Sequence, residues 1–169
     1  KSATALAATS AANASTSSSQ GASLGSIQSM SHDTHSRSLA AVVLFDQLPR
    51  NMFRGSPDQF ATDPLALGIA SEAIAAGLDR QLSADERTFL YMPYQHSERL
   101  ADQEESLRLF EDQERGMELY AANDVADGLR WMTLHRDIIA RFGRFPHRNH
   151  VLGRSPTDAE QAAGKVEPF

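Results

Sequence analysis

The chain has 169 residues, which allows one ordinary domain and hardly two. Its net charge of −6 at neutral pH disfavours nucleic-acid binding, and the lack of cysteine excludes disulfides, thiolate catalysis and cysteine-ligated metals. No apolar run is long enough to span a membrane. We therefore expect neither a nucleic-acid partner nor a membrane partner, and the composition alone points to no reaction.

Residues 1–36 differ in composition from the rest of the chain. They hold 15 Ser or Thr and eight Ala but only two charged residues, Lys1 and Asp33. With so few large apolar side chains, this stretch cannot offset the entropy lost on folding, which predicts a disordered leader. An organelle-targeting peptide is the alternative, although no arginine precedes Arg37. We expect a cytoplasmic protein whose helical domain spans residues 37–154.

Two helices are predicted directly after the leader. The first spans residues 37–48, where apolar side chains share one face, and Pro49 should end it. The second begins at Asp63, an N-cap residue followed by a proline that fits the first helical position. Gly77 should end it, because glycine readily adopts the left-handed conformation of a helix stop.

A capping box predicts the start of the third helix. Ser83 and Glu86 have the spacing at which each side chain bonds the backbone N–H of the other, and Pro93 should end the helix. Helical spacing of apolar residues then continues over residues 98–120, with Ser97 as a suitable N-cap.

The last long helix should end at Gly143. Thr157 and Glu160 form a second capping box, so the tail of residues 155–169 carries at most a short helix. No segment alternates between apolar and polar residues as a strand does. Because short loops join the helices, we predict an all-α fold of antiparallel helical hairpins, packed as an array or a small bundle.

Asp46 is a polar residue on the apolar face of its helix. It lies one turn after Val42 and Val43, where the spacing predicts burial. An unpaired buried carboxylate is costly, so Asp46 needs a cationic or hydrogen-bonding partner. Arg50, one turn further on, is the nearest cation, and the simplest interpretation is a structural salt bridge.

His96 stands in a polar segment beside Pro93. Histidine is the usual group for proton transfer near neutral pH, although most histidines have no such role. Glu98 and Asp102 follow closely and are the acids that a histidine base could use. Helix capping by Ser97 explains part of this segment but leaves His96 unexplained.

Basic residues gather near the C-terminal end of the chain. Residues 130–154 hold six arginines and three histidines with one acid, Asp137, whereas residues 98–127 hold ten acids and three bases. Two uses remain open, either pairing between an acidic and a basic helix or an anion site, since arginine suits carboxylate and phosphate. His135 lies on an apolar face, which favours a hydrogen-bonded core histidine.

Three segments together resemble a known family. They are Leu44-Phe-Asp-Gln-Leu-Pro-Arg-Asn-Met-Phe-Arg-Gly55, Tyr94-Gln-His-Ser-Glu-Arg-Leu-Ala-Asp-Gln103 and His135-Arg-Asp-Ile-Ile-Ala-Arg-Phe-Gly-Arg-Phe-Pro-His-Arg-Asn149. They are similar to an uncharacterised, mainly bacterial family designated domain of unknown function nine hundred and twenty-four. The resemblance covers residues 38–154 and implies a tetratricopeptide-like, right-handed helical array with no established reaction.

The residues that carry this resemblance are mostly polar. They include the groups singled out above and form the candidate ligand-binding set: Asp46, Arg50, Asn51, Arg54, His96, Glu98, Asp102, His135, Arg144, His147, Arg148 and Asn149.

Three functions remain open at this point. The first is a helical module that binds an anionic small molecule or peptide, through Arg50, Arg54, Arg144, Arg148 and His147. The second is a structural scaffold for protein interaction, and the third is a hydrolase-like enzyme that uses His96 with Glu98 or Asp102. We expect no cofactor and no bound metal, and the sequence does not indicate the oligomeric state. A shared cavity would favour a site, whereas arginines all paired with buried carboxylates would favour a scaffold.

Overall fold

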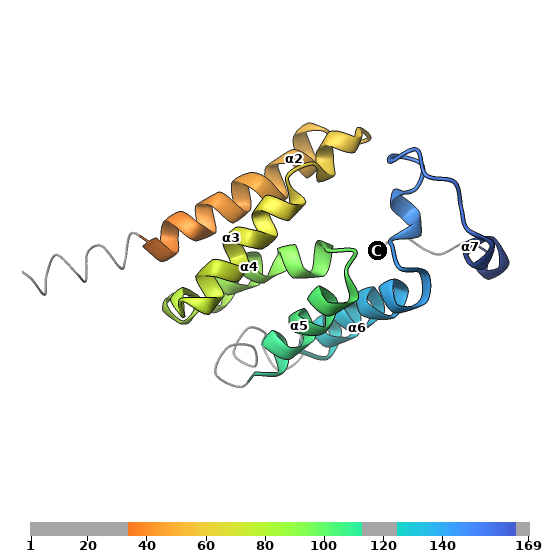
Figure 1. The fold of residues 1–169 in the computed structure, drawn as a ribbon. Helices are drawn as coiled ribbons and strands as arrows, with labels where there is room; N and C mark the ends of the chain where they lie inside the picture. The colour runs from red at the N-terminus through yellow and green to blue at the C-terminus, as the bar shows by residue number, and fades with distance from the viewer. Residues whose placement is uncertain (1–33, 113–124, 165–169) are drawn as a thin grey trace, which may run out of the picture.

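The computed structural model describes residues 34–112 and 125–164 of the chain. Within these two ranges every element of regular secondary structure is helical, in the arrangement shown in Figure 1. None of the helices described is both long and apolar enough to cross a membrane. The predicted all-α class is confirmed, and the tetratricopeptide-like arrangement stays a prediction. The predicted leader, residues 1–36, lies almost wholly outside the described residues.

The first helical run contains a π-helical turn. Residues 34–42 form its first part, η1 (Val43–Gln47) is the π-helical turn, and α2 (Leu48–Met52) completes it. The prediction that Pro49 ends this helix is wrong. Pro49 cannot donate to the carbonyl of Phe45, and the hydroxyl of Thr62 donates to that carbonyl instead, at 2.5 Å. A partner from another segment thus replaces the missing bond.

α3 (Asp63–Ala75) follows the short 3₁₀ helix η2 (Pro57–Phe60). Asp63 is not the N-cap, as predicted, because Thr62 takes that position and Asp63 stands in the first turn. The carboxylate of Asp63 is therefore available to a neighbouring segment. Gly77 has a φ of 70°, which confirms the predicted left-handed helix stop.

α4 (Ala84–His96) follows η3 (Leu78–Gln81) and begins with the predicted capping box. The prediction that the helix ends before Pro93 is wrong, because α4 continues through this buried proline to His96. A proline in the last turn removes a single helical hydrogen bond, and burial of its ring offsets part of that loss. The additional turn places His96 at the end of the helix.

The second half of the fold begins with α5 (Leu100–Glu111), which packs against α6 (Val125–Phe142). Figure 1 shows these two helices side by side. η4 (Pro146–Arg148) and α7 (Asp158–Ala163) follow α6, and the predicted second capping box begins α7. Gly143, with a φ of 69°, ends α6 as predicted.

Two details of this half differ from the sequence-based expectations. Arg99, not Ser97, is the N-cap of α5, and Ser97 ends α4. The predicted continuation of this helix toward residue 120 falls largely outside the described residues, since α5 ends at Glu111.

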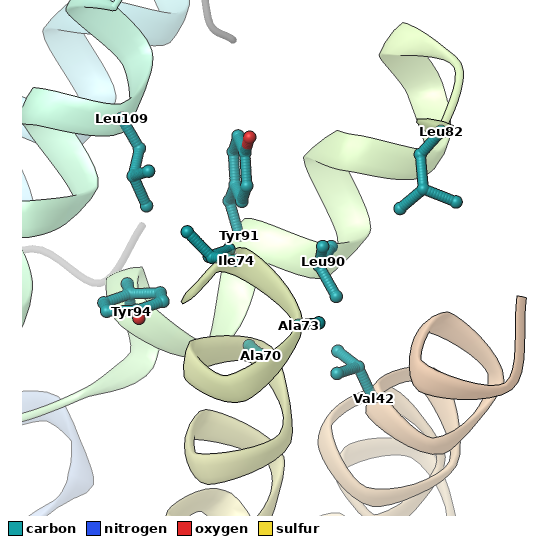
Figure 2. Packing of buried hydrophobic residues seen from close by; sticks show 9 residues of the cluster. All are labelled: Val42, Ala70, Ala73, Ile74, Leu82, Leu90, Tyr91, Tyr94 and Leu109. Atoms are coloured by element: carbon teal, nitrogen blue, oxygen red, sulfur yellow. The ribbon is translucent and has the colours of Figure 1, made fainter. Parts of the chain in front are cut away.

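The main core lies between α3 and α4 and reaches the first helical run and α5. Alanines on α3 allow α4 to approach closely, and Figure 2 shows the larger side chains of the neighbouring elements around them. The cluster comprises Val42, Ala70, Ala73, Ile74, Leu82, Leu90, Tyr91, Tyr94 and Leu109. This packing fixes the last turn of α4, and with it His96, relative to η1.

A second, smaller cluster fixes the segment that follows α6. Ile138 and Ile139 of α6 pack with Phe145, which is only 1% exposed, and Phe142 lies against them. Phe145 directly precedes η4, so the buried ring holds that 3₁₀ helix against the end of α6.

Candidate functional site

The three segments that resemble the known family meet around one cavity of about 590 Å³. Each contributes side chains: α2 and the turn after it, the last turn of α4, and α6 together with η4. η2 adds two further lining residues. The wall consists of Arg50, Arg54, Gln59, Phe60, Gln95, His96, Trp131, His135, Phe145, His147 and Arg148.

A second cavity of about 570 Å³ shares part of this wall. Phe60, His96 and Arg148 line both cavities. Its other lining residues come mainly from α3 and from the junction between α4 and α5, and many of them are apolar. The shared residues therefore contact the space of both cavities.

Asp46 lies in the π-helical turn and is fully buried, with an exposed fraction of 0%. Nδ1 of His96 is 2.8 Å from its Oδ1, and Nη2 of Arg50 is 3.4 Å from the same oxygen. Gln47 donates to its other oxygen. Burial raises the pKa of this carboxyl, but the His96 contact and the charges of His96 and Arg50 lower it further, so the net pKa lies below its ordinary value.

The prediction that Asp46 is buried and paired is thus confirmed in its geometry, and its principal partner is His96. With Nδ1 directed at Asp46, Nε2 is the second ring nitrogen, and it makes no hydrogen bond to a described residue. The side chain of His96 is 23% exposed and lines both cavities. A buried carboxylate therefore orients a histidine whose other nitrogen is available.

The predicted partners of His96 have other roles. Glu98 accepts hydrogen bonds from Arg154 at 2.6 Å and from the backbone N–H of Phe145 at 2.8 Å. Asp102 accepts one from the hydroxyl of Ser97 at 2.5 Å. Neither acid hydrogen-bonds to His96, although both line the second cavity with it, so their use with His96 as acid and base stays a prediction. The actual carboxylate partner, Asp46, lies 50 positions earlier.

Arg148 is the most deeply buried cation of the cavity wall, with an exposed fraction of 7%. Its guanidinium carbon lies 4.5 Å from the ring centroid of Phe60 and 4.6 Å from that of Phe145. Its Nη1 is 3.7 Å from the carboxylate of Asp63, and its buried Nε has no hydrogen-bond partner among the described residues. Burial lowers the pKa of Arg148 to about 10.

The two other arginines of the cavity differ in their pairing. Arg50 donates to both carboxylate oxygens of Asp63, at 2.6 and 3.0 Å. Arg54 donates to the side-chain oxygen of Asn51 at 3.3 Å, and among the described residues no carboxylate lies within ion-pair distance of it. Asn51 in turn donates to the carbonyl of Gln47 at 3.1 Å. Arg50 is thus largely neutralised, whereas Arg54 is not.

His135 and His147 complete the polar wall. Burial lowers the pKa of each to about 4, and the charge of Arg148 adds to both shifts. Both rings lie against Phe145, with centroid separations of 5.7 Å and 5.5 Å. The two imidazoles are therefore neutral at pH 7, and His135 is a half-buried wall residue rather than the core histidine that was expected.

Arg144 and Asn149 do not reach the cavity. Arg144 donates to both carboxylate oxygens of Glu160 at 2.7 Å, and Asn149 donates to the same carboxylate at 3.1 Å. Arg154 donates to the side-chain oxygen of Asn149 at 3.0 Å. The predicted convergence of Arg144 on an anion site is wrong, because Glu160 of α7 neutralises it and ties this segment to α7.

Some residues of the site were not identified from the sequence. The sequence indicates Asp63 only as a helix cap and does not indicate Phe60 or Trp131 as wall residues. The sequence does not place Asp63 inside the helix, because the proline after it fits the first helical position with Asp63 as the N-cap.

The balance of charge in and around the cavity is positive. Three guanidinium groups, of Arg50, Arg54 and Arg148, stand against two carboxylates, of Asp46 and Asp63, which leaves one excess positive charge. Within residues 34–112 and 125–164, no group of three or more His, Asp or Glu side chains has a metal-binding arrangement. The cavity wall thus carries an excess of positive charge and a histidine that a buried carboxylate orients.

Comparison with known proteins places this geometry in a family. Residues 4–164 match the family described as "Bacterial protein of unknown function (DUF924)". The chain belongs to the DUF924 family. A solved structure, described as "Structure of Protein of Unknown Function ATU0120 from Agrobacterium tumefaciens", is 38% identical, with a TM-score of 0.65 over 84% of this chain and 76% of that one. No curated protein matches. The resemblance seen in the three segments is confirmed, and the DUF924 family has no assigned biochemical function.

Proposed function

We propose that this protein binds a small anionic molecule, or the carboxylate of a peptide, in the cavity lined by Arg148. The observation that carries the proposal is the buried Nε of Arg148, which has no hydrogen-bond partner among the described residues. A buried polar group without a partner costs about 1–3 kcal/mol, and more when it is charged. Oxygen atoms of a bound anion would remove that cost.

The surroundings of Arg148 determine how an anion can approach it. The rings of Phe60 and Phe145 lie near the guanidinium carbon at 4.5 and 4.6 Å, so they cover the guanidinium group. An anion would therefore have to bind the donor edge, which fits carboxylate or phosphate with two parallel bonds. Arg54 supplies a second cation without a carboxylate partner in the described part of the chain.

A purely structural scaffold explains only part of the arrangement. Arg50, Arg144 and Arg154 each pair with a carboxylate at 2.6–2.7 Å, and these pairs support the fold. Arg54 has no carboxylate within ion-pair distance in the described part of the chain, Arg148 lies 3.7 Å from that of Asp63, and both arginines line the cavity. The arrangement therefore supports a binding module over a scaffold. Within the proposal, a net charge of −6 favours a small anion over a nucleic acid, and the cytoplasm is the proposed location.

The proposal is tested by thermal unfolding of the protein with inorganic phosphate and with small carboxylates. A ligand present at a hundredfold excess over its Kd stabilises the folded state by about 2.7 kcal/mol, which raises the Tm. Arg148→Gln should abolish this rise while leaving the Tm without anion unchanged or higher, because it removes a buried charge. Arg130→Gln, at an exposed position of α6, is the matched control and should retain the rise.

Two results would contradict the proposal. The first is a protein whose Tm responds to none of these anions. The second is an Arg148→Gln variant that loses stability but keeps a full anion response, since this would assign Arg148 to the fold alone.

A further inference from the structure

The Asp46–His96 pair has the arrangement of a proton-transfer dyad. Asp46 is fully buried and is 2.8 Å from Nδ1 of His96, so it fixes the orientation of the ring and favours a proton on Nδ1. Nε2 then carries the lone pair, makes no hydrogen bond to a described residue, and belongs to a ring that lines both cavities. A buried carboxylate also stabilises the imidazolium that forms when Nε2 takes up a proton.

A structural salt bridge alone does not account for the geometry of the Asp46–His96 pair. Arg50 lies 3.4 Å from the same oxygen of Asp46, and Gln47 donates to the other oxygen, so the buried carboxylate has partners without His96. His96 is 23% exposed in the cavity wall rather than sealed in the core.

Among the three histidines that line the cavity of about 590 Å³, His96 is left as the proton acceptor. Asp46 and Arg50 face it from η1 and α2, and Arg148 of η4 shares its cavity wall. His135 of α6 and His147 line the same cavity, but burial lowers the pKa of each to about 4, which makes them weak bases.

We propose that His96, oriented by Asp46, is the general base for hydrolysis of a phosphate monoester bound at Arg148. This inference rests on the proposed anion binding. Because His96 and Arg148 line the same two cavities, an anionic group bound at Arg148 occupies the same cavity as the base. A phosphoryl group is both an anion and an electrophile, whereas a free carboxylate is not a target for water. The cavity of about 590 Å³ has room for the organic part of the ester against Phe60 and Trp131.

The proposed step uses water as the second reactant. His96 Nε2 takes a proton from water as the water oxygen forms a bond to phosphorus. The ester P–O bond breaks, its electron pair stays on the leaving oxygen, and that oxygen takes a proton from solvent while His96 gives its proton to solvent. The products are an alcohol or phenol and inorganic phosphate, and His96 returns to its neutral form. The guanidinium of Arg148 stabilises the charge on the phosphoryl oxygens, as positioned cations do in phosphoryl transfer.

The test measures phosphate release from p-nitrophenyl phosphate by the full chain. His96→Gln should lower kcat/KM by about 10²–10⁴-fold, the usual contribution of a general base, while inorganic phosphate still raises the Tm of this variant. His150→Gln is the matched control, because His150 is exposed and lies outside both cavities, and it should leave the rate unchanged.

Asp46 acts through His96 and is a positioning residue, so its test needs a second measurement. Asp46→Asn should lower kcat and shift the acidic limb of the pH–rate profile to lower pH, because loss of the carboxylate disfavours the charged imidazole. A structural role alone would leave the profile in place. The Tm of Asp46→Asn establishes that the variant is folded at the assay temperature.

The outcomes separate this inference from the proposed function. A Tm that rises with phosphate, together with no His96-dependent hydrolysis between about pH 5 and about pH 9, would overturn the catalytic inference and leave anion binding intact. Hydrolysis that is equal in the parent protein and in His96→Gln would overturn it as well. A protein that neither binds phosphate nor hydrolyses the ester would overturn both.

Discussion

Glu98 accepts two hydrogen bonds from Arg154, at 2.6 and 3.0 Å, across 56 positions of the chain. The same carboxylate accepts the backbone N–H of Phe145 at 2.8 Å. Burial raises the pKa of Glu98, but the bonds from Arg154 and Phe145 lower it further, so the net pKa lies below its ordinary value. The junction between α4 and α5 is thereby joined to the segment that carries His147 and Arg148.

We predict that Glu98→Ala lowers the free energy of unfolding by about 2 kcal/mol, because charge-assisted bonds of this kind contribute about 1.5–3 kcal/mol. The same variant should weaken phosphate binding, since the segment with Arg148 loses an attachment. Urea unfolding and the phosphate-induced rise in Tm measure the two effects. If Glu98→Ala keeps the parent midpoint in urea, this junction does not depend on Glu98.

Asp46 should be a larger determinant of stability than an exposed acid. Its carboxylate is 0% exposed and contacts His96 and Arg50, whereas Glu111 is exposed at the end of α5. Breaking a buried pair costs about 3–5 kcal/mol, and loss of an exposed one under about 1 kcal/mol. Asp46→Ala should therefore lower the urea midpoint far more than Glu111→Ala does. Equal urea midpoints for the two variants would show that the buried contacts of Asp46 do not stabilise the fold.

The sequence predicts local features of this fold well. Both capping boxes are present, and Gly77 and Gly143 end their helices, because each depends on residues within one turn. The predictions that Pro49 and Pro93 end their helices are wrong, for a reason that neighbouring residues in the sequence do not reveal. The carbonyl left without a donor by Pro49 is satisfied by Thr62, which the chain brings there only after folding.

The candidate site likewise has features that the local sequence predicts and contacts that it does not. The position of Asp46 on an apolar face predicts its burial. Its pairing with His96 spans 50 positions, so the local spacing of residues does not indicate it. Arg144 was expected at the cavity because its sequence neighbours are basic, yet its partner Glu160 lies 16 positions later. Periodicity identifies which polar residues need partners, and the packing of the helices decides which partners they have.

Stability should fall in mildly acidic solution because of the two neutral histidines. Burial lowers the pKa of His135 and of His147 from 6.5 to about 4. Between these values the unfolded chain binds protons that the folded chain does not, so the free energy of unfolding decreases as pH falls from about 6.5 toward about 4. Since both residues are only half-buried, each should contribute about 1–2 kcal/mol of this loss.

The histidine prediction is measured by urea unfolding of the parent and of His147→Gln at a series of pH values. The variant should lose less stability than the parent over this range, since it retains only His135. His150→Gln, which removes an exposed histidine, should follow the parent curve. Parallel curves for the parent and His147→Gln would show that His147 is protonated in the folded protein as readily as in the unfolded one.

Arg144 should prove structural and unrelated to anion binding. Its two 2.7 Å bonds to Glu160 lower the pKa of that carboxyl to about 2, the largest single cause of the shift. A depressed carboxyl pKa stabilises the fold above the ordinary value of 4.5, and this stabilisation is lost as pH falls from 4.5 toward about 2. Arg144→Gln should lower the Tm and flatten this acidic decline, and Glu160→Gln should do the same. The two changes together should cost less than their sum, because either one already breaks the pair.

Neither variant should reduce the rise in Tm caused by phosphate, whereas Arg148→Gln should abolish it. Loss of the phosphate response in Arg144→Gln would return Arg144 to the anion site and contradict its assignment to the fold.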